Sequence, residues 1–169
     1  MLKEKLEECG AVKYGEFTLT SGKKSKYYVD IKKASTNPGI LKEIVEQMAE
    51  EVDGTKIAGM ELGAVPLAAA LSLETNIPFL MIRKKKKGHG TGGRIEGDLE
   101  EGEKVIIVED VTTTGGSSIE TIEVLRDAGA IVEKVLVVVD REEGAKEALE
   151  NVDVELIPLV TATELLKNK

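Results

Sequence analysis

The sequence predicts an α/β fold in which helices flank a central, mostly parallel sheet. Strand-like and helix-like segments alternate along most of the chain. The candidate strands, such as VIIV at 105–108 and LVVV at 136–139, are apolar throughout and do not alternate apolar with polar residues. Continuous apolar strands are typical of parallel sheets whose two faces are both covered by helices.

Local signals place the individual elements. Asn37-Pro38 is a typical helix start, because asparagine caps the first turn and proline suits its first position. Ser117 and Glu120 have the spacing of a capping box, and Gly129 is a typical helix stop. We expect helices at 2–10, 38–52, 66–74, 117–128, 143–150 and 161–168. We expect strands at 16–20, 26–31, 56–62, 77–82, 104–110, 132–140 and 154–160, the first two forming a hairpin or flap.

Composition limits the class of protein. A chain of 169 residues suggests a single domain, with 1–36 as an N-terminal helix and flap and 37–169 as the core. The single cysteine, Cys9, excludes an internal disulfide, and we expect it to be a half-buried helix residue. A net charge of -8 argues against nucleic-acid binding. The absence of a long apolar run or signal-like N-terminus predicts a cytoplasmic protein that does not enter the membrane.

The segment VIIVEDVTTTGGSS, at 105–118, has the composition of a ligand site at a strand end. Ligands of parallel sheets bind outside the carboxyl ends of the strands. Here glycines, hydroxyl side chains and the start of the next helix can cradle a phosphate. Glu109 and Asp110 accept hydrogen bonds, so their expected partners are sugar hydroxyls or a hydrated cation. A ribose 5-phosphate would suit both the phosphate cradle and the two carboxylates. The alternative is that the segment is an ordinary strand–loop–helix connection without a ligand.

A basic run, RKKKK at 83–87, ends another candidate strand and leads into a long glycine-rich loop at 84–98. Loops of this length in compact domains are often functional lids. The run can instead be a solvated charged loop or a nonspecific polyanion patch. His89, the only histidine, lies in this polar loop, which favours handling of a phosphate or proton over a place in the core.

Four motifs in order give the chain a specific resemblance. EDVTTTGGS at 109–117 resembles the phosphoribosyl pyrophosphate (PRPP) motif of type I phosphoribosyltransferases. Three other stretches resemble the orotate phosphoribosyltransferases: the flap FTLTSGKKSKYYVD at 17–30, the catalytic loop RKKKKGHGTGG at 83–93 and the strand end DREEG at 140–144. The resemblance covers almost the whole chain. It implies a type I phosphoribosyltransferase fold, a Rossmann-like parallel sheet flanked by helices with a small N-terminal flap or hood.

The resemblance also implies a reaction and a set of site residues. The family transfers ribose 5-phosphate from PRPP to orotate, giving orotidine 5′-monophosphate and pyrophosphate in pyrimidine biosynthesis. It works as a homodimer that shares the catalytic loop. Mg²⁺ is the implied cofactor, held mainly by PRPP and water and not by direct side-chain ligation. The implied catalytic residues are Lys84, Lys87 and His89. The implied PRPP-binding residues are Arg83, Lys84, Lys87, His89, Glu109, Asp110, Val111, Thr112, Thr113, Thr114, Gly115, Gly116 and Ser117; the implied orotate-binding residues are Tyr28, Val29, Thr113 and Arg141.

Other interpretations of these residues stay open at this stage. Arg141 suits a carboxylate because its guanidinium binds in a bidentate manner, but it can also be a surface residue paired with Glu142 or Glu143. Many bacterial relatives carry lysine where this chain has Thr20 and Gly63, so two cations of the expected set are missing. The alternative functions are a purine-salvage phosphoribosyltransferase and a non-catalytic regulator that senses PRPP.

Overall fold

A six-stranded sheet forms the centre of the computed structural model, which describes residues 1–86, 88 and 93–169. The strand order is β5-β4-β3-β6-β7-β8, and every pair is parallel except β4 with β5. The predicted α/β class is therefore confirmed. The strands are β3 (Lys56–Met60), β4 (Phe79–Ile82), β5 (Ile95–Glu96), β6 (Lys104–Thr112), β7 (Ile131–Asp140) and β8 (Glu155–Thr161).

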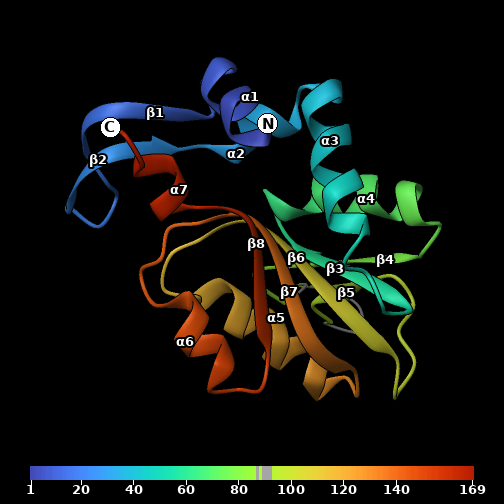
Figure 1. The fold of residues 1–169 in the computed structure, drawn as a ribbon. Coiled ribbons are helices and arrows are strands. Elements are labelled where there is room, and N and C mark those ends of the chain that lie inside the picture. Colours follow the sequence, from blue (N-terminus) through green and yellow to red (C-terminus); the bar gives the residue numbers. More distant parts are fainter. Residues whose placement is uncertain (87, 89–92) are drawn as a thin grey trace.

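Helices cover both faces of this sheet (Figure 1). On one face α1 to α4 pack with alternate strand residues such as Ile106 and Val108, and on the other α5 and α6 pack with Ile107. Because successive residues of a strand point to opposite faces, burial on both faces requires strands that are apolar throughout. The helices are α1 (Leu2–Glu8), α2 (Ile31–Ser35), α3 (Pro38–Ala49), α4 (Ala64–Thr75), α5 (Gly116–Asp127), α6 (Ala145–Glu150) and α7 (Ala162–Leu166).

The strand order contains a topological switch point between β3 and β6. From β3 the chain runs outward to β4 and β5, then returns to β6 on the other side of β3 and continues to β7 and β8. The crossover connections leave opposite ways from these two central strands, so a crevice opens at their carboxyl ends. Glu109 and Asp110 lie near the carboxyl end of β6 at this crevice, and the loop at 61–63 enters it from β3.

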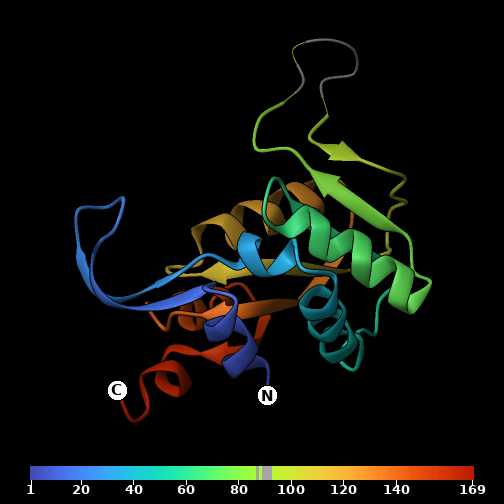
Figure 2. The ribbon, with the colours of Figure 1, turned by 90° about the horizontal axis from the view of Figure 1, so that it is seen from above.

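The N-terminal hairpin forms a separate two-stranded sheet of β1 (Val12–Thr18) and β2 (Lys24–Val29). Figure 2 shows it projecting away from the central sheet. The predicted hairpin is confirmed, but its strands lie earlier than expected. Residue 31, which we assigned to a strand, instead begins helix α2, because Ile31 and Ala34 are fully buried in the core. This burial depends on packing against distant parts of the chain. A helix of five residues is too short to show a helical pattern of apolar residues in the sequence.

Three other local predictions have mixed outcomes. The Asn37 cap is confirmed, since its Oδ1 accepts hydrogen bonds from the N–H groups of Gly39 and Ile40. The Ser117–Glu120 capping box is wrong: α5 begins one residue earlier, with Gly115 as its N-cap, and no side chain caps it. The predicted loop at 84–98 contains the short strand β5 at its end. A capping box occurs instead at Thr161 and Glu164, before α7.

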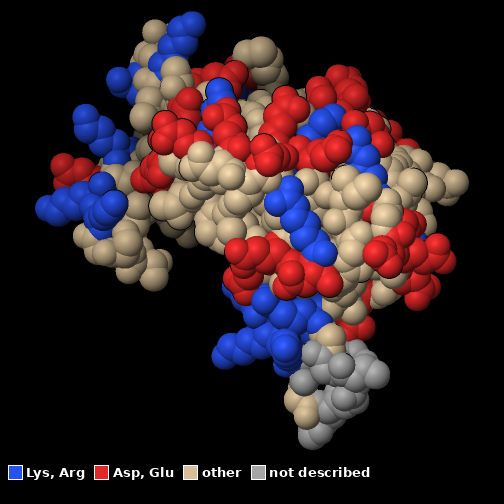
Figure 3. All heavy atoms as spheres, turned by 90° about the horizontal axis from the view of Figure 1, so that it is seen from below, with Lys and Arg blue, Asp and Glu red and all other residues tan. Residues whose placement is uncertain are grey.

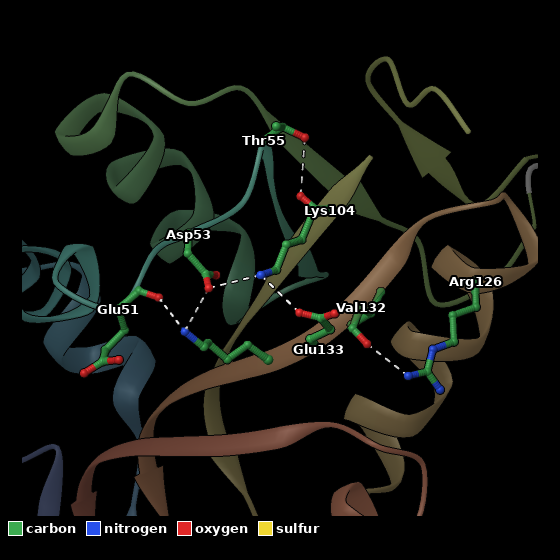
Figure 4. Close-up of polar contacts among 8 residues, drawn as sticks. Glu51, Asp53, Thr55, Lys104, Arg126, Val132 and Glu133 are labelled. Carbon is green, nitrogen blue, oxygen red and sulfur yellow. Dashed lines mark hydrogen bonds and ion pairs between the residues drawn. The ribbon is translucent and has the colours of Figure 1, made fainter. Parts of the chain in front are cut away.

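An ionic network closes the opposite, amino-terminal edge of the sheet (Figure 4). Lys104 Nζ lies 3.1 Å from both Asp53 Oδ2 and Glu133 Oε2, and Lys134 Nζ lies 3.4 Å from the same Asp53 oxygen. Hydrogen bonds from Lys104 and then Lys134 hold the pKa of Asp53 below its usual range. This network ties strands β6 and β7 to the segment that precedes β3. Among the described residues, no helix combines the length and apolar character needed to cross a bilayer.

Candidate active site

The end of β6, from Glu109 onward, and the turn that follows it form a segment held against β7 and the start of α6. Thr112 Oγ1 donates to Asp140 Oδ1 at 3.1 Å, and Arg141 N–H donates to the Thr112 carbonyl at 3.0 Å. Gly115 has a φ of +88°, and a Cβ there would meet Ala145 Cα at 3.1 Å. Only glycine meets both demands without strain. The chain therefore turns tightly from β6 into α5 and leaves the first N–H groups of α5 facing the crevice.

Glu109 is an unusual member of this segment because its side chain is almost fully buried, with 4% of the residue exposed. Ser118 Oγ donates to its Oε1 at 3.2 Å. Burial raises the pKa of Glu109 to about 8, and the adjacent charge of Asp110 adds to the rise. Protonation of Glu109 is therefore favoured relative to an exposed glutamate, which lowers the negative charge that an anionic ligand meets beside Asp110.

A first cavity, of about 270 Å³, occupies the crevice between β3 and β6. A Cβ at Gly63 would lie 2.8 Å from Asp110 Cγ, so any larger residue there would displace the carboxylate. Glu61 Oε1 accepts the Lys84 N–H at 2.8 Å, which ties the base of the basic segment to this crevice. The residues lining the cavity are Lys32, Met60, Glu61, Leu62, Gly63, Ala64, Lys84, Glu109, Asp110 and Ser117.

A second cavity, of about 490 Å³, lies between the hairpin and the carboxyl ends of β6 and β7. Its walls combine hydroxyl and apolar side chains with Arg141, which is only 8% exposed. The lining residues are Thr18, Leu19, Thr20, Ser21, Lys23, Tyr28, Val29, Val111, Thr113, Thr114, Arg141 and Glu143.

The predicted site residues thus fall around two cavities on one edge of the sheet. Lys84, Glu109, Asp110 and Ser117 line the first, and Tyr28, Val29, Val111, Thr113, Thr114 and Arg141 line the second. Thr112, Gly115 and Gly116 line neither cavity; they shape the turn between them. Lys87 and His89 lie outside the described residues.

Arg83 makes a contact that the sequence did not indicate. Its Nε donates to Glu96 Oε1 at 2.8 Å, so the guanidinium is engaged across the β4–β5 pair. Arg94 anchors the same region, because its Nη2 bonds the Lys84 carbonyl at 2.8 Å and Glu120 Oε1 at 2.5 Å. This ion pair engages the Glu120 carboxylate, but the expected capping box is absent because Gly115 is the N-cap and Ser117 lies inside α5.

The cavities also include residues that the sequence analysis missed. Lys32 of α2 faces the first cavity together with Glu61. Its sequence signal was hidden because α2 was not predicted. Glu61 was expected inside the strand at 56–62, whereas β3 ends at Met60 and Glu61 begins the loop that enters the crevice. Ser25 and Tyr27, which contact Arg141, were expected only as parts of the flap at 17–30, with no role of their own at the site.

Charge is distributed unevenly over the molecule. Figure 3 shows Lys and Arg side chains gathered beside the grey atoms at one end of the face and again at the upper left, with Asp and Glu side chains over much of the area between. The basic residues described near this end of the chain are Arg83, Lys84, Lys85, Lys86 and Arg94. The unevenness expected from the sequence is therefore present in space, with cations concentrated near the β4–β5 end.

Comparison with known proteins identifies the class and then the family. A model of the phosphoribosyl transferase domain matches residues 31–162, which places the chain in the phosphoribosyltransferase class. The orotate phosphoribosyltransferase of Methanosarcina mazei is 58% identical over 165 residues, which cover 96% of this chain and 88% of the relative. The chain belongs to the orotate phosphoribosyltransferase family, as its motifs predicted.

Solved structures agree with this assignment. The crystal structure of orotate phosphoribosyltransferase from Aeropyrum pernix has a TM-score of 0.88 at 36% identity, covering 99% of this chain and 97% of that one. The enzyme from Mycobacterium tuberculosis H37Rv, solved in complex with PRPP, has a TM-score of 0.75 at 27% identity, covering 98% and 99%. The small hairpin, sheet and helices therefore form the fold of this family.

The raised pKa of Glu109 predicts how stability depends on pH. The folded protein holds this proton more tightly than the unfolded chain, whose value is near 4.5. The resulting stabilisation is full below about pH 4.5 and is lost progressively as the pH rises to about 8. Glu109→Gln removes this loss, so its melting temperature should exceed that of the wild type by a margin that widens by about 10 °C from pH 5 to pH 8.5.

Scanning calorimetry at the two pH values measures this margin. The matched control is Glu123→Gln, which alters an exposed glutamate on α5 and should leave the difference from wild type independent of pH. A Glu109→Gln margin that stays constant between pH 5 and pH 8.5 would show that Glu109 titrates normally.

Proposed function

We propose that the protein transfers ribose 5-phosphate from PRPP to orotate, producing orotidine 5′-monophosphate and pyrophosphate for pyrimidine biosynthesis. One observation carries the choice of base: the buried guanidinium of Arg141 lies in a cavity that shares Thr113 and Thr114 with the phosphate turn. A planar guanidinium suits the carboxylate of orotate. The names of the most similar relatives, and the PRPP complex of the tuberculosis enzyme, support the same substrates.

The proposed reaction breaks the bond between ribose C1 and pyrophosphate and forms a bond from C1 to a ring nitrogen of orotate, whose proton is released. The turn at 112–117 would bind the 5′-phosphate through backbone N–H groups and hydroxyls. Asp110, with Glu109, would accept hydrogen bonds from the ribose hydroxyls. Arg141, Thr113 and the flap residues Tyr28 and Val29 would orient the base.

The departing pyrophosphate needs positive charge and exclusion of water. Lys84 lines the crevice at the switch point, and we propose that it stabilises the charge that develops there. Lys87 and His89 are proposed partners in this role, and Arg83 is proposed to contribute once its contact with Glu96 is exchanged for the ligand. Lys32, on the same cavity wall, is a further cation within this crevice.

Mg²⁺ is the proposed cofactor. The carboxylates of Glu61 and Asp110 line the first cavity, and oxygen donors of this kind suit a hydrated magnesium ion carried by PRPP. They would hold the ion mainly through its water molecules. When bound, the ion neutralises part of the pyrophosphate charge.

Neither alternative function fits the second cavity as well. A purine base has no carboxylate for Arg141 to bind, so a purine-salvage enzyme leaves this buried cation without a role. A regulator that only senses PRPP requires no cavity for a base beside the phosphate turn. Both alternatives are outcomes of the activity test below.

We also propose that residues 1–169 act as one phosphoribosyltransferase domain in the cytoplasm, and that two copies form a homodimer in which the catalytic loop contributes to the partner's site. Leu73 of α4 is 87% exposed, Leu62 71% and Met81 of β4 40%. Leu62 precedes α4 and Leu73 lies near its end, and large apolar side chains with this exposure are candidates for an interaction surface.

The dimer has a direct test. Because burial of these apolar side chains would drive association, sedimentation equilibrium at micromolar concentration should give twice the chain's mass of 18.2 kDa. Leu73→Lys should shift the equilibrium towards the monomer, whereas the exposed Asp127→Asn should not. A wild-type protein that sediments as a monomer under these conditions contradicts the proposal.

The proposed reaction predicts a simple absorbance change. On addition of PRPP and Mg²⁺, the orotate absorbance should fall and pyrophosphate should appear in equal amount. Chelation of the magnesium should stop the reaction, because pyrophosphate then departs with its charge unscreened. Turnover of guanine or adenine but not of orotate would favour purine salvage, and PRPP binding without any turnover would favour the regulator.

A further inference from the structure

The hairpin does more at the second cavity than line it. Tyr27 of β2 is only 6% exposed, and the Arg141 guanidinium carbon lies 4.3 Å from the centre of its ring. A cation over an aromatic face is attracted by the ring, and the attraction grows when both groups are shielded from water. Tyr27 therefore fixes the face of the Arg141 guanidinium.

A second hairpin residue fixes one edge of the same group. Arg141 Nη2 donates to Ser25 Oγ at 3.1 Å, and Ser25 Oγ in turn donates to the Tyr27 carbonyl at 2.7 Å. The Ser25 hydroxyl is thereby oriented so that its lone pairs face the arginine. Tyr27 contacts the face of the guanidinium and Ser25 binds one edge, so these two hairpin residues together fix the orientation of its plane.

The remaining edge is incompletely satisfied. Arg141 Nε is buried and has no hydrogen-bond partner among the described residues; the nearest counter-charge is Glu143 Oε2 at 3.5 Å. The Glu143 side chain is 41% exposed and lines the cavity. A buried cation with an unfilled donor is primed for an incoming carboxylate, because a new charge-assisted bond replaces a weak one.

We propose that Tyr27 and Ser25 are positioning residues that hold the Arg141 guanidinium ready for the carboxylate of the base, so that the N-terminal hairpin sets the specificity for an acidic pyrimidine. This inference rests on the proposed function. In this proposal the hairpin stabilises the side chain of Arg141, which directly follows β7. Tyr27 and its neighbour Tyr28 then have different roles, because Tyr28 is 42% exposed and lines the second cavity itself.

Steady-state kinetics of the full chain, with orotate and PRPP varied in turn, test the proposal. Tyr27→Leu should raise the KM for orotate about tenfold, the size expected for losing a desolvated cation–π contact, and leave the KM for PRPP within about twofold. Tyr27→Phe keeps the ring and should restore the wild-type KM for orotate. Ser25→Ala should raise the KM for orotate alone by about threefold or more.

The matched control is Tyr14→Leu, because Tyr14 of β1 is the direct cross-strand partner of Tyr27 and bonds Glu7 instead of Arg141. It should leave both KM values within about twofold, although it removes an equal ring from the hairpin. If Tyr27→Leu proves unstable, Ser25→Ala decides the question on its own.

Three results would overturn the inference while leaving the proposed function intact: equal increases in both KM values, a fall in kcat without a change in the KM for orotate, or a Tyr27→Phe variant as impaired as Tyr27→Leu. A wild-type protein that does not use orotate would instead overturn the proposed function.

Discussion

The parallel pairing of β6 with β7 is the constraint on which the rest of the site depends. Register places Thr112 opposite Asp140, so that the Thr112 carbonyl accepts the Arg141 N–H and the Thr113 carbonyl accepts the Ala145 N–H. A slip of one residue would turn every side chain to the other face of the sheet. The turn at 112–117 and Arg141 are therefore fixed relative to each other by backbone hydrogen bonds, independently of any ligand.

Electrostatics is arranged locally within an acidic chain. Three acidic side chains line the crevice at the switch point, but burial raises the pKa of Glu109, and Lys32 and Lys84 line the same cavity. At the second cavity a single buried cation, Arg141, is supported by an aromatic face and by a neighbouring hydroxyl. The net charge of -8 is thus a sum over the whole chain, whereas the proposed ligands would meet the cations Lys32, Lys84 and Arg141 at the two cavities.

Much of this arrangement could be predicted from sequence because it depends on local signals. Apolar strands, the Asn37 cap and the acids before a glycine turn are all readable from neighbouring residues. The capping box at Ser117 failed because α5 begins at Gly116, directly after the turn at Gly115, so that Ser117 lies inside the helix. Helix α2, and with it Lys32, was hidden because tertiary burial determines so short a helix. The contact of Tyr27 with Arg141 joins residues 114 positions apart, and no local pattern indicates it.

The most direct test of the central claim is a crystal structure of the protein with orotidine 5′-monophosphate, which contains both halves of the proposed ligand. The phosphate should lie in the turn at 112–117, the ribose hydroxyls against Asp110, and the base carboxylate against the Arg141 guanidinium over the Tyr27 ring. A nucleotide bound with its carboxylate away from Arg141, or with its phosphate outside this turn, would contradict the claim that one sheet register builds one continuous site.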